Sequence, residues 1–120
     1  MTYRAVLANA FSLGMLPPGA EHTVKFVRST PEWVSGLVRA AIKVVSAIRH
    51  PATEALAFSL LGLDPDEVEK APAVTFGRDD CLIVFLPRWK GGRPPETREF
   101  TLEEIRALAE GVDVWVCGLA

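Results

Sequence analysis

The sequence predicts one α/β domain over residues 1–120, with a mixed sheet of about five strands packed by about three helices. Strand-like and helix-like segments follow one another without strict alternation, which is typical of a sheet that is only partly parallel. Hydrophobic residues make up 49% of the chain, and 120 residues are enough for a single core. Charges or prolines interrupt every apolar run before it reaches the length of a membrane span.

The first part of the chain is expected to form two strands and a helix. Tyr3 to Leu7 is apolar enough for a buried strand, and the alternation of Thr23 to Val27 predicts a half-buried one. Prolines and glycines between them make residues 13–21 a loop. Ser29-Thr30-Pro31-Glu32 has the spacing of a capping box, which predicts a helix start. Apolar residues then recur along one helical face: Val34, Leu37, Val38 and Ala41.

A second helix is expected in the middle of the chain. The β-branched segment Lys43 to Ile48 comes first, and a helical pattern then runs from Pro51 to about Leu61, ended by Gly62. Proline suits the first helical position, where its missing N–H is no loss, so His50 is the expected N-cap residue. Asp64-Pro65-Asp66 opens a turn or a short extra helical piece.

Two further strands are expected after this helix. Val74 to Phe76 is the first, and residues 77–80 form a hairpin turn. The second is Cys81 to Leu86, a continuous apolar run of the kind found in strands that are covered on both faces. Pro87 is expected to stop it, because proline cannot donate to a sheet ladder.

The chain is expected to close with a helix and a strand. Residues 88–99 form a loop that crowds basic side chains, and Thr101-Leu102-Glu103-Glu104 has the spacing of a second capping box. The helix should run to about Glu110 and stop at Gly111, the usual residue just past a helix end. Val112 to Cys117 is then the last strand.

Charge and cysteine content exclude several classes of protein. The net charge of −2 gives no global reason to bind nucleic acid, so duplex DNA is not expected as a partner. Cys81 and Cys117 both fall in expected buried strands, and two such cysteines form neither a disulfide framework nor a zinc cluster. The apolar run at the N-terminus is too short for a secretory signal. We therefore expect a cytoplasmic protein with no metal, no cofactor and no membrane partner.

The start of the second helix is the first candidate for chemistry. A helix N-terminus presents backbone N–H groups and the positive end of the helix dipole, which together suit an anion. His50 stands there, and histidine exchanges a proton near neutral pH. The stretch therefore indicates an acid–base histidine beside a bound phosphate. The plainer alternative is a partly exposed polar residue at a helix start.

Three motifs, taken together, resemble a known family. They are Leu7-Ala8-Asn9-Ala10-Phe11-Ser12, then Ser46-Ala47-Ile48-Arg49-His50 followed by Thr53, and last Arg93-Pro94-Pro95-Glu96 before Phe100-Thr101-Leu102-Glu103-Glu104-Ile105. In order and approximate spacing they resemble the viral ring nucleases. These are type III anti-CRISPR proteins of archaeal viruses, with relatives in phages and bacterial chromosomes. The resemblance covers essentially the whole chain.

The resemblance implies a homodimer that binds cyclic tetra-adenylate, the second messenger of type III CRISPR defence. The family cuts this ring without metal, leaving linear adenylates with a 2′,3′-cyclic phosphate. Loss of the messenger switches off the defence nucleases. A non-catalytic protein that binds or senses a cyclic oligonucleotide remains the alternative, and it would tolerate loss of His50.

The resemblance also implies roles for individual residues. His50 would be the general acid, Glu96 would orient it or act as a base, and Arg93 would pair with phosphate. Ser12 would contact the ligand, with Asn9 as the neighbouring polar candidate. Each has a plainer alternative: Arg93 and Glu96 as an exposed loop pair, Ser12 as a turn cap, and Asn9 as a partner for backbone at the strand end.

Two positions depart from the family pattern. Arg49 stands where the family often has glycine, and it adds a phosphate contact or narrows the pocket. Lys70 would have to replace an arginine that some relatives carry near this position. A DNA-binding viral regulator is disfavoured by the acidic balance and by the lack of a basic recognition helix.

Overall fold

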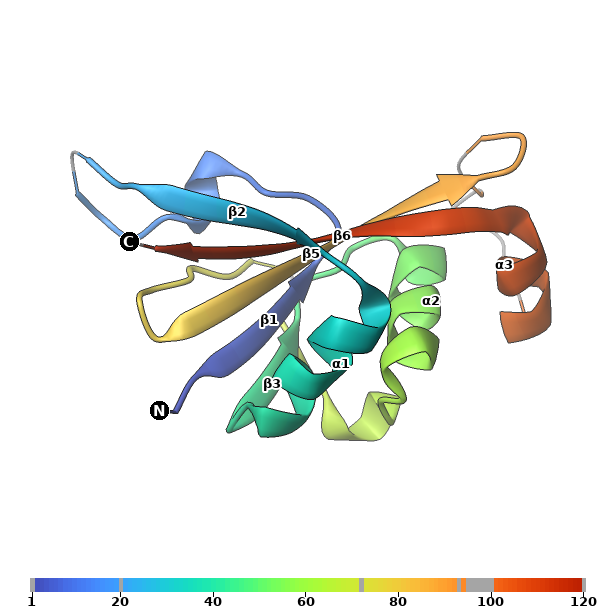
Figure 1. Ribbon diagram of the computed structural model, residues 1–120, viewed down its shortest axis with the longest axis horizontal. Coiled ribbons are helices and arrows are strands. Elements are labelled where there is room, and N and C mark those ends of the chain that lie inside the picture. Colours follow the sequence, from blue (N-terminus) through green and yellow to red (C-terminus); the bar gives the residue numbers. More distant parts are fainter. Residues whose placement is uncertain (1, 20, 72, 93, 95–100, 120) are drawn as a thin grey trace.

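Six strands form one mixed sheet in the order β2-β6-β5-β1-β3-β4 (Figure 1). The structure is a computed structural model that describes residues 2–19, 21–71, 73–92, 94 and 101–119. The strands are β1 (Arg4–Ala8), β2 (Val24–Ser29), β3 (Lys43–Ser46), β4 (Glu69–Lys70), β5 (Asp80–Trp89) and β6 (Ala109–Leu119). β5, β1, β3 and β4 run parallel to one another, whereas β6 is antiparallel to both β5 and β2. The predicted mixed α/β class is confirmed.

Three helices pack beside this sheet, as expected. They are α1 (Pro31–Ala40), α2 (Pro51–Leu61) and α3 (Leu102–Leu108), and two short 3₁₀ turns are added at Leu13–Met15 and Pro65–Glu67. α1 and α2 lie on the same face of the sheet (Figure 1). β5 and β6 run on together beyond β1 as a two-stranded arm, with α3 at its end (Figure 1). Within the described residues, no helix combines the length and the apolar character needed to cross a membrane.

The central strand β1 is buried on both of its faces. Ala5 and Leu7 face the helices, where Val34 of α1 and Phe58 of α2 pack against them. Val6 and Ala8 point to the other face, in a second cluster that is closed by parts of the chain without regular strand structure. That cluster includes Phe11, Met15, Leu16, Val74 and Phe76. The carboxyl end of β1 therefore opens between two packed layers.

Helix boundaries follow the predicted capping signals with two corrections. Thr30, not Ser29, is the N-cap of α1, because its hydroxyl accepts from the backbone N–H of Trp33. The capping box of Thr101 and Glu104 is present at α3, as predicted. That helix nevertheless ends at Leu108 rather than near Glu110, since β6 begins at Ala109 to pair with the long β5.

The strand predictions fail at three places. Pro87 does not end β5: it pairs with Val112, and β1 extends only as far as Val84 on its other side, so no ladder needs the missing N–H. Val74 to Phe76 is not a strand; Phe76 instead enters the core and donates its backbone N–H to the Met15 carbonyl. The two-residue strand β4 was missed, because it is charged and too short to show periodicity.

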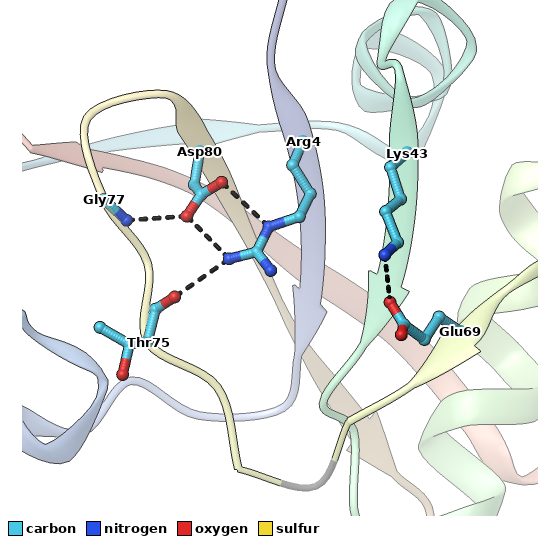
Figure 2. A network of polar contacts seen from close by, with 6 residues as sticks. All are labelled: Arg4, Lys43, Glu69, Thr75, Gly77 and Asp80. Carbon is cyan, nitrogen blue, oxygen red and sulfur yellow. Dashed lines mark hydrogen bonds and ion pairs between the residues drawn. The ribbon is translucent and has the colours of Figure 1, made fainter.

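An ion pair at the amino ends of β1 and β5 holds the segment that leads into β5 (Figure 2). Nε and Nη2 of Arg4 donate to the two carboxylate oxygens of Asp80 at 3.0 and 2.8 Å. The same guanidinium reaches the Thr75 carbonyl at 3.0 Å, and Asp80 accepts from the backbone N–H of Gly77 at 2.7 Å. These bonds fix the chain on both sides of Phe76.

Candidate functional site

A pocket of about 390 Å³ lies at the carboxyl end of β1. β1 and β3 are parallel neighbours, with Leu7 opposite Ser46, so the segments that follow them emerge at the same edge of the sheet. This edge is where open α/β sheets place ligands. Its lining residues come from three segments: Asn9, Ala10, Ser12, Gly14 and Met15; Ala47 and Arg49; Ala73 and Val74. Three of the predicted site residues, Asn9, Ser12 and Arg49, are thus brought together.

Asn9 joins two walls of this pocket. Its side-chain oxygen accepts a hydrogen bond from the backbone N–H of Arg49 at 3.3 Å, across 40 positions in the sequence. Asn9 is half-buried, whereas Arg49 is exposed. The plainer role considered for Asn9, bonding backbone at the strand end, is therefore present. The same hydrogen bond also fixes the position of the Arg49 backbone.

Ser12 contributes an exposed hydroxyl to the pocket. It is the N-cap residue of the turn Leu13–Met15, yet its side chain accepts no capping hydrogen bond from that turn. A Cβ at Gly14 would lie 3.8 Å from the Ser12 Oγ, which is ordinary van der Waals contact. The turn is thus held by backbone bonds, and the hydroxyl points to the pocket side as a potential ligand contact.

His50 is the N-cap of α2, as predicted, but it is buried rather than partly exposed. The backbone N–H of Thr53 donates to Nδ1 at 3.3 Å, and Nε2 lies 2.9 Å from the carbonyl oxygen of Pro94. This pattern fits the neutral ring with its proton on Nε2, donated to Pro94. The Thr53 hydroxyl is 3.1 Å from Nδ1, so an oxygen faces each ring nitrogen. The ring is also 6.4 Å from that of Trp89, between centroids.

The side chains of Arg49 and His50 leave the turn on opposite sides. The backbone at His50 is extended, and successive side chains of extended chain point opposite ways. Arg49 consequently lines the pocket, whereas His50 is directed inward. The helix start has fewer donors to offer a ligand than a free helix end. Pro51 has no N–H, the Thr53 N–H donates to the His50 ring, and the Glu54 N–H donates to the His50 carbonyl.

The remaining predicted residues are placed only in part. Arg93 and Glu96 lie outside the described residues. Pro94, which follows Arg93 directly, is described and buried, and its carbonyl contacts His50. Lys70 is in β4, where its ammonium lies 3.0 Å from Glu54 Oε1 rather than lining the pocket.

Two polar residues of this region, Ser46 and Glu54, were given no role from the sequence. Ser46 is buried at the end of β3, and its hydroxyl donates to Glu54 Oε2 at 2.7 Å. A glutamate in the first turn of a helix is common, so the position of Glu54 in the sequence carried no special signal.

Among the residues that the structure describes, no three His, Cys, Asp or Glu side chains come close enough together to hold a metal ion.

An apolar hollow of about 320 Å³ lies beside the pocket, on the sheet face away from α1 and α2. It is lined by Ala10, Phe11, Phe26, Val84, Leu86, Trp115 and Cys117. Phe26 and Leu86 remain 49% and 42% exposed, which is unusual for large apolar side chains on a sheet. Ala10 lines both the pocket and the hollow, so the two are adjacent.

Charged side chains lie on the β2, β6 and β5 strands that carry this hollow. Asp113 lies 2.7 Å from Arg88 and 3.8 Å from Arg28, and the bond to Arg88 is the main reason why the pKa of Asp113 is lowered. The guanidinium of Arg28 is stacked over Trp115, 4.9 Å from its ring centroid. A Cβ at Gly111 would meet the end of the Arg88 side chain, so glycine gives Arg88 its place.

Comparison with known proteins finds a relative in fold. No family model matches the sequence, and a search of curated proteins finds no match. Among solved structures, the chain is similar to B116 of Sulfolobus turreted icosahedral virus, with a TM-score of 0.65 and 18% sequence identity. The alignment covers 96% of this chain and 98% of that chain. This protein therefore has, over nearly its whole length, the fold of a viral protein of similar size.

Proposed function

We propose that this protein is a metal-independent ring nuclease that cleaves cyclic tetra-adenylate and thereby switches off type III CRISPR defence. The observation that carries the proposal is the grouping of Asn9, Ser12 and Arg49 around one pocket, directly beside the turn that holds His50. They come from two segments about 40 positions apart; the ring-nuclease resemblance implies a ligand contact for Ser12, with Asn9 as its polar neighbour, and Arg49 stands where the family often has glycine. The viral fold relative is compatible with this role.

The reaction needs alignment and a proton rather than an outside nucleophile. A ribose 2′-hydroxyl attacks the adjacent phosphorus in line, the bond from phosphorus to the 5′-oxygen breaks, and a 2′,3′-cyclic phosphate remains. Arg49 and the Ser12 hydroxyl would hold the phosphate and stabilise its developing charge. Arg93 would add a planar guanidinium, and Glu96 would orient His50 or accept the proton of the attacking hydroxyl.

His50 would supply the proton that the leaving 5′-oxygen takes up. In the structure the Pro94 carbonyl accepts the Nε2 proton. To act as the acid, the ring would first take up a second proton on Nδ1, which could donate to the Thr53 hydroxyl, so that loss of the Nε2 proton leaves the neutral imidazole. In the reactive complex the 5′-oxygen would take the place of that carbonyl. Pro94 belongs to the Arg93-Pro94-Pro95-Glu96 motif, so one residue of this motif contacts the proposed acid.

The proposed protein acts as a homodimer in the cytoplasm of the cell that makes the messenger. A ring of four identical nucleotides has repeated linkages, and a two-fold dimer presents two equal pockets to it. We place the contact between copies at the apolar hollow around Phe26 and Leu86, since it adjoins the pocket through Ala10. A copy seated there would stand beside the bound ring.

A second function is favoured by one specific observation. His50 is only 1% exposed, and its Nε2 is already bonded to Pro94. A protein that binds the ring without cutting it, as a sponge or a sensor, would require no release of that nitrogen. The difference between the two functions is thus whether a bound ring gains access to His50.

The test is incubation of the protein with cyclic tetra-adenylate in excess EDTA, with products identified by mass. Wild type, His50→Asn and Ser12→Ala are compared; asparagine keeps a helix cap but supplies no acid. Linear adenylates with a 2′,3′-cyclic phosphate are expected from wild type. His50→Asn should bind the ring and cut it about 10²–10⁴-fold more slowly.

Other outcomes separate the alternatives. A wild-type protein that binds the ring and leaves it intact is a sponge or sensor. Equal cleavage by wild type and His50→Asn removes His50 from the mechanism. A protein that neither binds nor cuts the ring shares only the fold of its viral relative.

A further inference from the structure

Side chains of β3 and α2 close the turn that carries Arg49 and His50. The Ser46 hydroxyl donates to Glu54 Oε2 at 2.7 Å and accepts from the backbone N–H of Ile48 at 3.4 Å. The backbone N–H of Glu54 donates to the His50 carbonyl at 3.0 Å. Glu54 therefore binds both ends of the turn, one through its side chain and the other through its backbone.

Lys70 holds the second oxygen of the same carboxylate. Its Nζ lies 3.0 Å from Glu54 Oε1, and Lys70 is opposite Ser46 in the parallel pairing of β3 and β4. The backbone N–H of Ala71 also donates to the Ser46 carbonyl at 2.9 Å. The Glu54 side chain is 15% exposed and Ser46 is 2% exposed, so the charge-assisted bond between them is largely shielded from water, whereas Lys70 is 64% exposed.

We propose that Glu54 is a positioning residue for the site, acting through the turn that it closes. This role rests on the proposed function and goes beyond it, because the family resemblance implies no role for Glu54. One turn carries both Arg49, on the pocket side, and His50, on the inner side. Its geometry therefore sets where the phosphate contact and the proton donor stand relative to each other, and a misplacement of about 1 Å costs on the order of 10²-fold in rate.

The chain supplies a matched control for this ion pair. Lys43 and Glu69 form the same kind of pair between β3 and β4, with a distance of 2.7 Å (Figure 2). Both side chains are about half exposed, and the pair includes no residue of the turn at 47–50. Glu69→Ala therefore removes the other lysine–glutamate pair that includes a residue of β4, and it leaves the bonds of Glu54 to the turn in place.

The experiment compares Glu54→Ala, Glu54→Gln and Glu69→Ala with wild type. Cleavage of cyclic tetra-adenylate gives kcat, and binding of a ring with methylated 2′-hydroxyls, which cannot attack, gives Kd. Glu54→Ala should lower kcat by about 10- to 100-fold with Kd little changed. Glu54→Gln should keep most of the activity, because the amide oxygen still accepts from Ser46. Glu69→Ala should match wild type.

A second readout does not depend on cleavage. The chain has two histidines, His22 and His50, so ¹⁵N spectra of the imidazoles separate the site from a distant reference. Glu54→Ala should move the His50 ring resonances and leave those of His22 in place. If the His50 resonances stay unchanged, Glu54 does not position it, whether or not the ring is cut. A loss of kcat that merely follows loss of folded protein would equally overturn the proposal.

Discussion

Thr53 donates its backbone N–H to Nδ1 of His50, so the proposed acid is also the cap of the helix that follows it. The ring is buried, and its second nitrogen is bonded to the carbonyl of Pro94, which joins a residue 44 positions away to the start of α2. A substitution at this position therefore changes the stability of the protein as well as its chemistry. The two effects can be separated by the choice of side chain.

His50→Ala is expected to lower the free energy of unfolding by about 1–3 kcal/mol. It removes a helix cap, worth about 0.5–2 kcal/mol, and leaves space where a buried ring stood. His50→Asn should recover about 1 kcal/mol of this loss, because asparagine caps helices well. Urea unfolding of the three proteins measures the difference. Identical values for the two variants would show that the bond from Thr53 contributes nothing to stability.

Arg4→Met is expected to cost about 1–3 kcal/mol of stability. It leaves the Asp80 carboxylate, 13% exposed, without its two hydrogen bonds from the guanidinium (Figure 2). Breaking a fully buried pair costs about 3–5 kcal/mol, and the 30% exposure of Arg4 reduces that figure. Thermal unfolding measures it. Lys43→Met breaks an exposed pair and should lower the stability much less, because water and salt screen such pairs; a similar loss in both variants would contradict the distinction.

Cys117 is expected to resist thiol reagents at neutral pH. Its ionisation in the unfolded chain is expected to lower the stability of the folded protein at alkaline pH. Burial, with a smaller contribution from Cys81, raises the pKa of its thiol to about 11. The reactive thiolate is therefore scarce at pH 8 in the folded protein. Above the ordinary thiol pKa the unfolded chain loses this proton while the folded chain keeps it, so stability falls as the pH rises toward 11.

Urea unfolding from pH 7 to 10.5, with Cys117→Ala beside wild type, measures this effect on stability. The variant should show a smaller alkaline loss than wild type. Reaction with an aromatic disulfide reagent at pH 8 gives the accessibility of the thiol. Rapid modification of Cys117 in the folded protein would contradict the expectation.

Phe26→Glu is expected to convert the proposed dimer into a monomer. A carboxylate at this position would enter the apolar hollow that we assign to the second copy. Val27 is the matched control, because it is 58% exposed and its side chain points to the other face of β2. Sedimentation should give a dimer for wild type and Val27→Glu and a monomer for Phe26→Glu. A wild-type monomer at micromolar concentration would exclude the proposed contact.

Much of the fold could be predicted where the local signal and the tertiary structure agree. Proline at the first position and Gly62 at the end bound α2, and the φ of +66° at Gly62 is one that glycine adopts without strain. The apolar run from Tyr3 to Leu7 predicted a buried strand, and β1 is buried on both faces. The prediction that Pro87 ends the strand was wrong. The energetic cost of a proline in a strand depends on whether a neighbouring strand needs an N–H at that position, and only the sheet order reveals this.

The sequence predicted which residues form the site better than it predicted how their side chains are oriented. Asn9, Ser12 and Arg49 do gather at one pocket, since parallel strands bring the ends of β1 and β3 together. The inward direction of His50 depends on the backbone angles of one turn, and no periodicity in the sequence encodes these. The Ser46–Glu54 bond, likewise, joins residues whose individual positions looked ordinary.

The sheet order has a consequence for how the chain is made. β2 is synthesised early, yet its ladder partner is β6, with Val24 opposite Leu119 and Ser29 opposite Val114. While the chain grows, β2 leaves the ribosome long before the strand that it needs. A chain interrupted after α3 would thus lose two strands rather than one, because the β2 edge would have nothing to join. The C-terminal segment is therefore the part whose arrival completes the sheet.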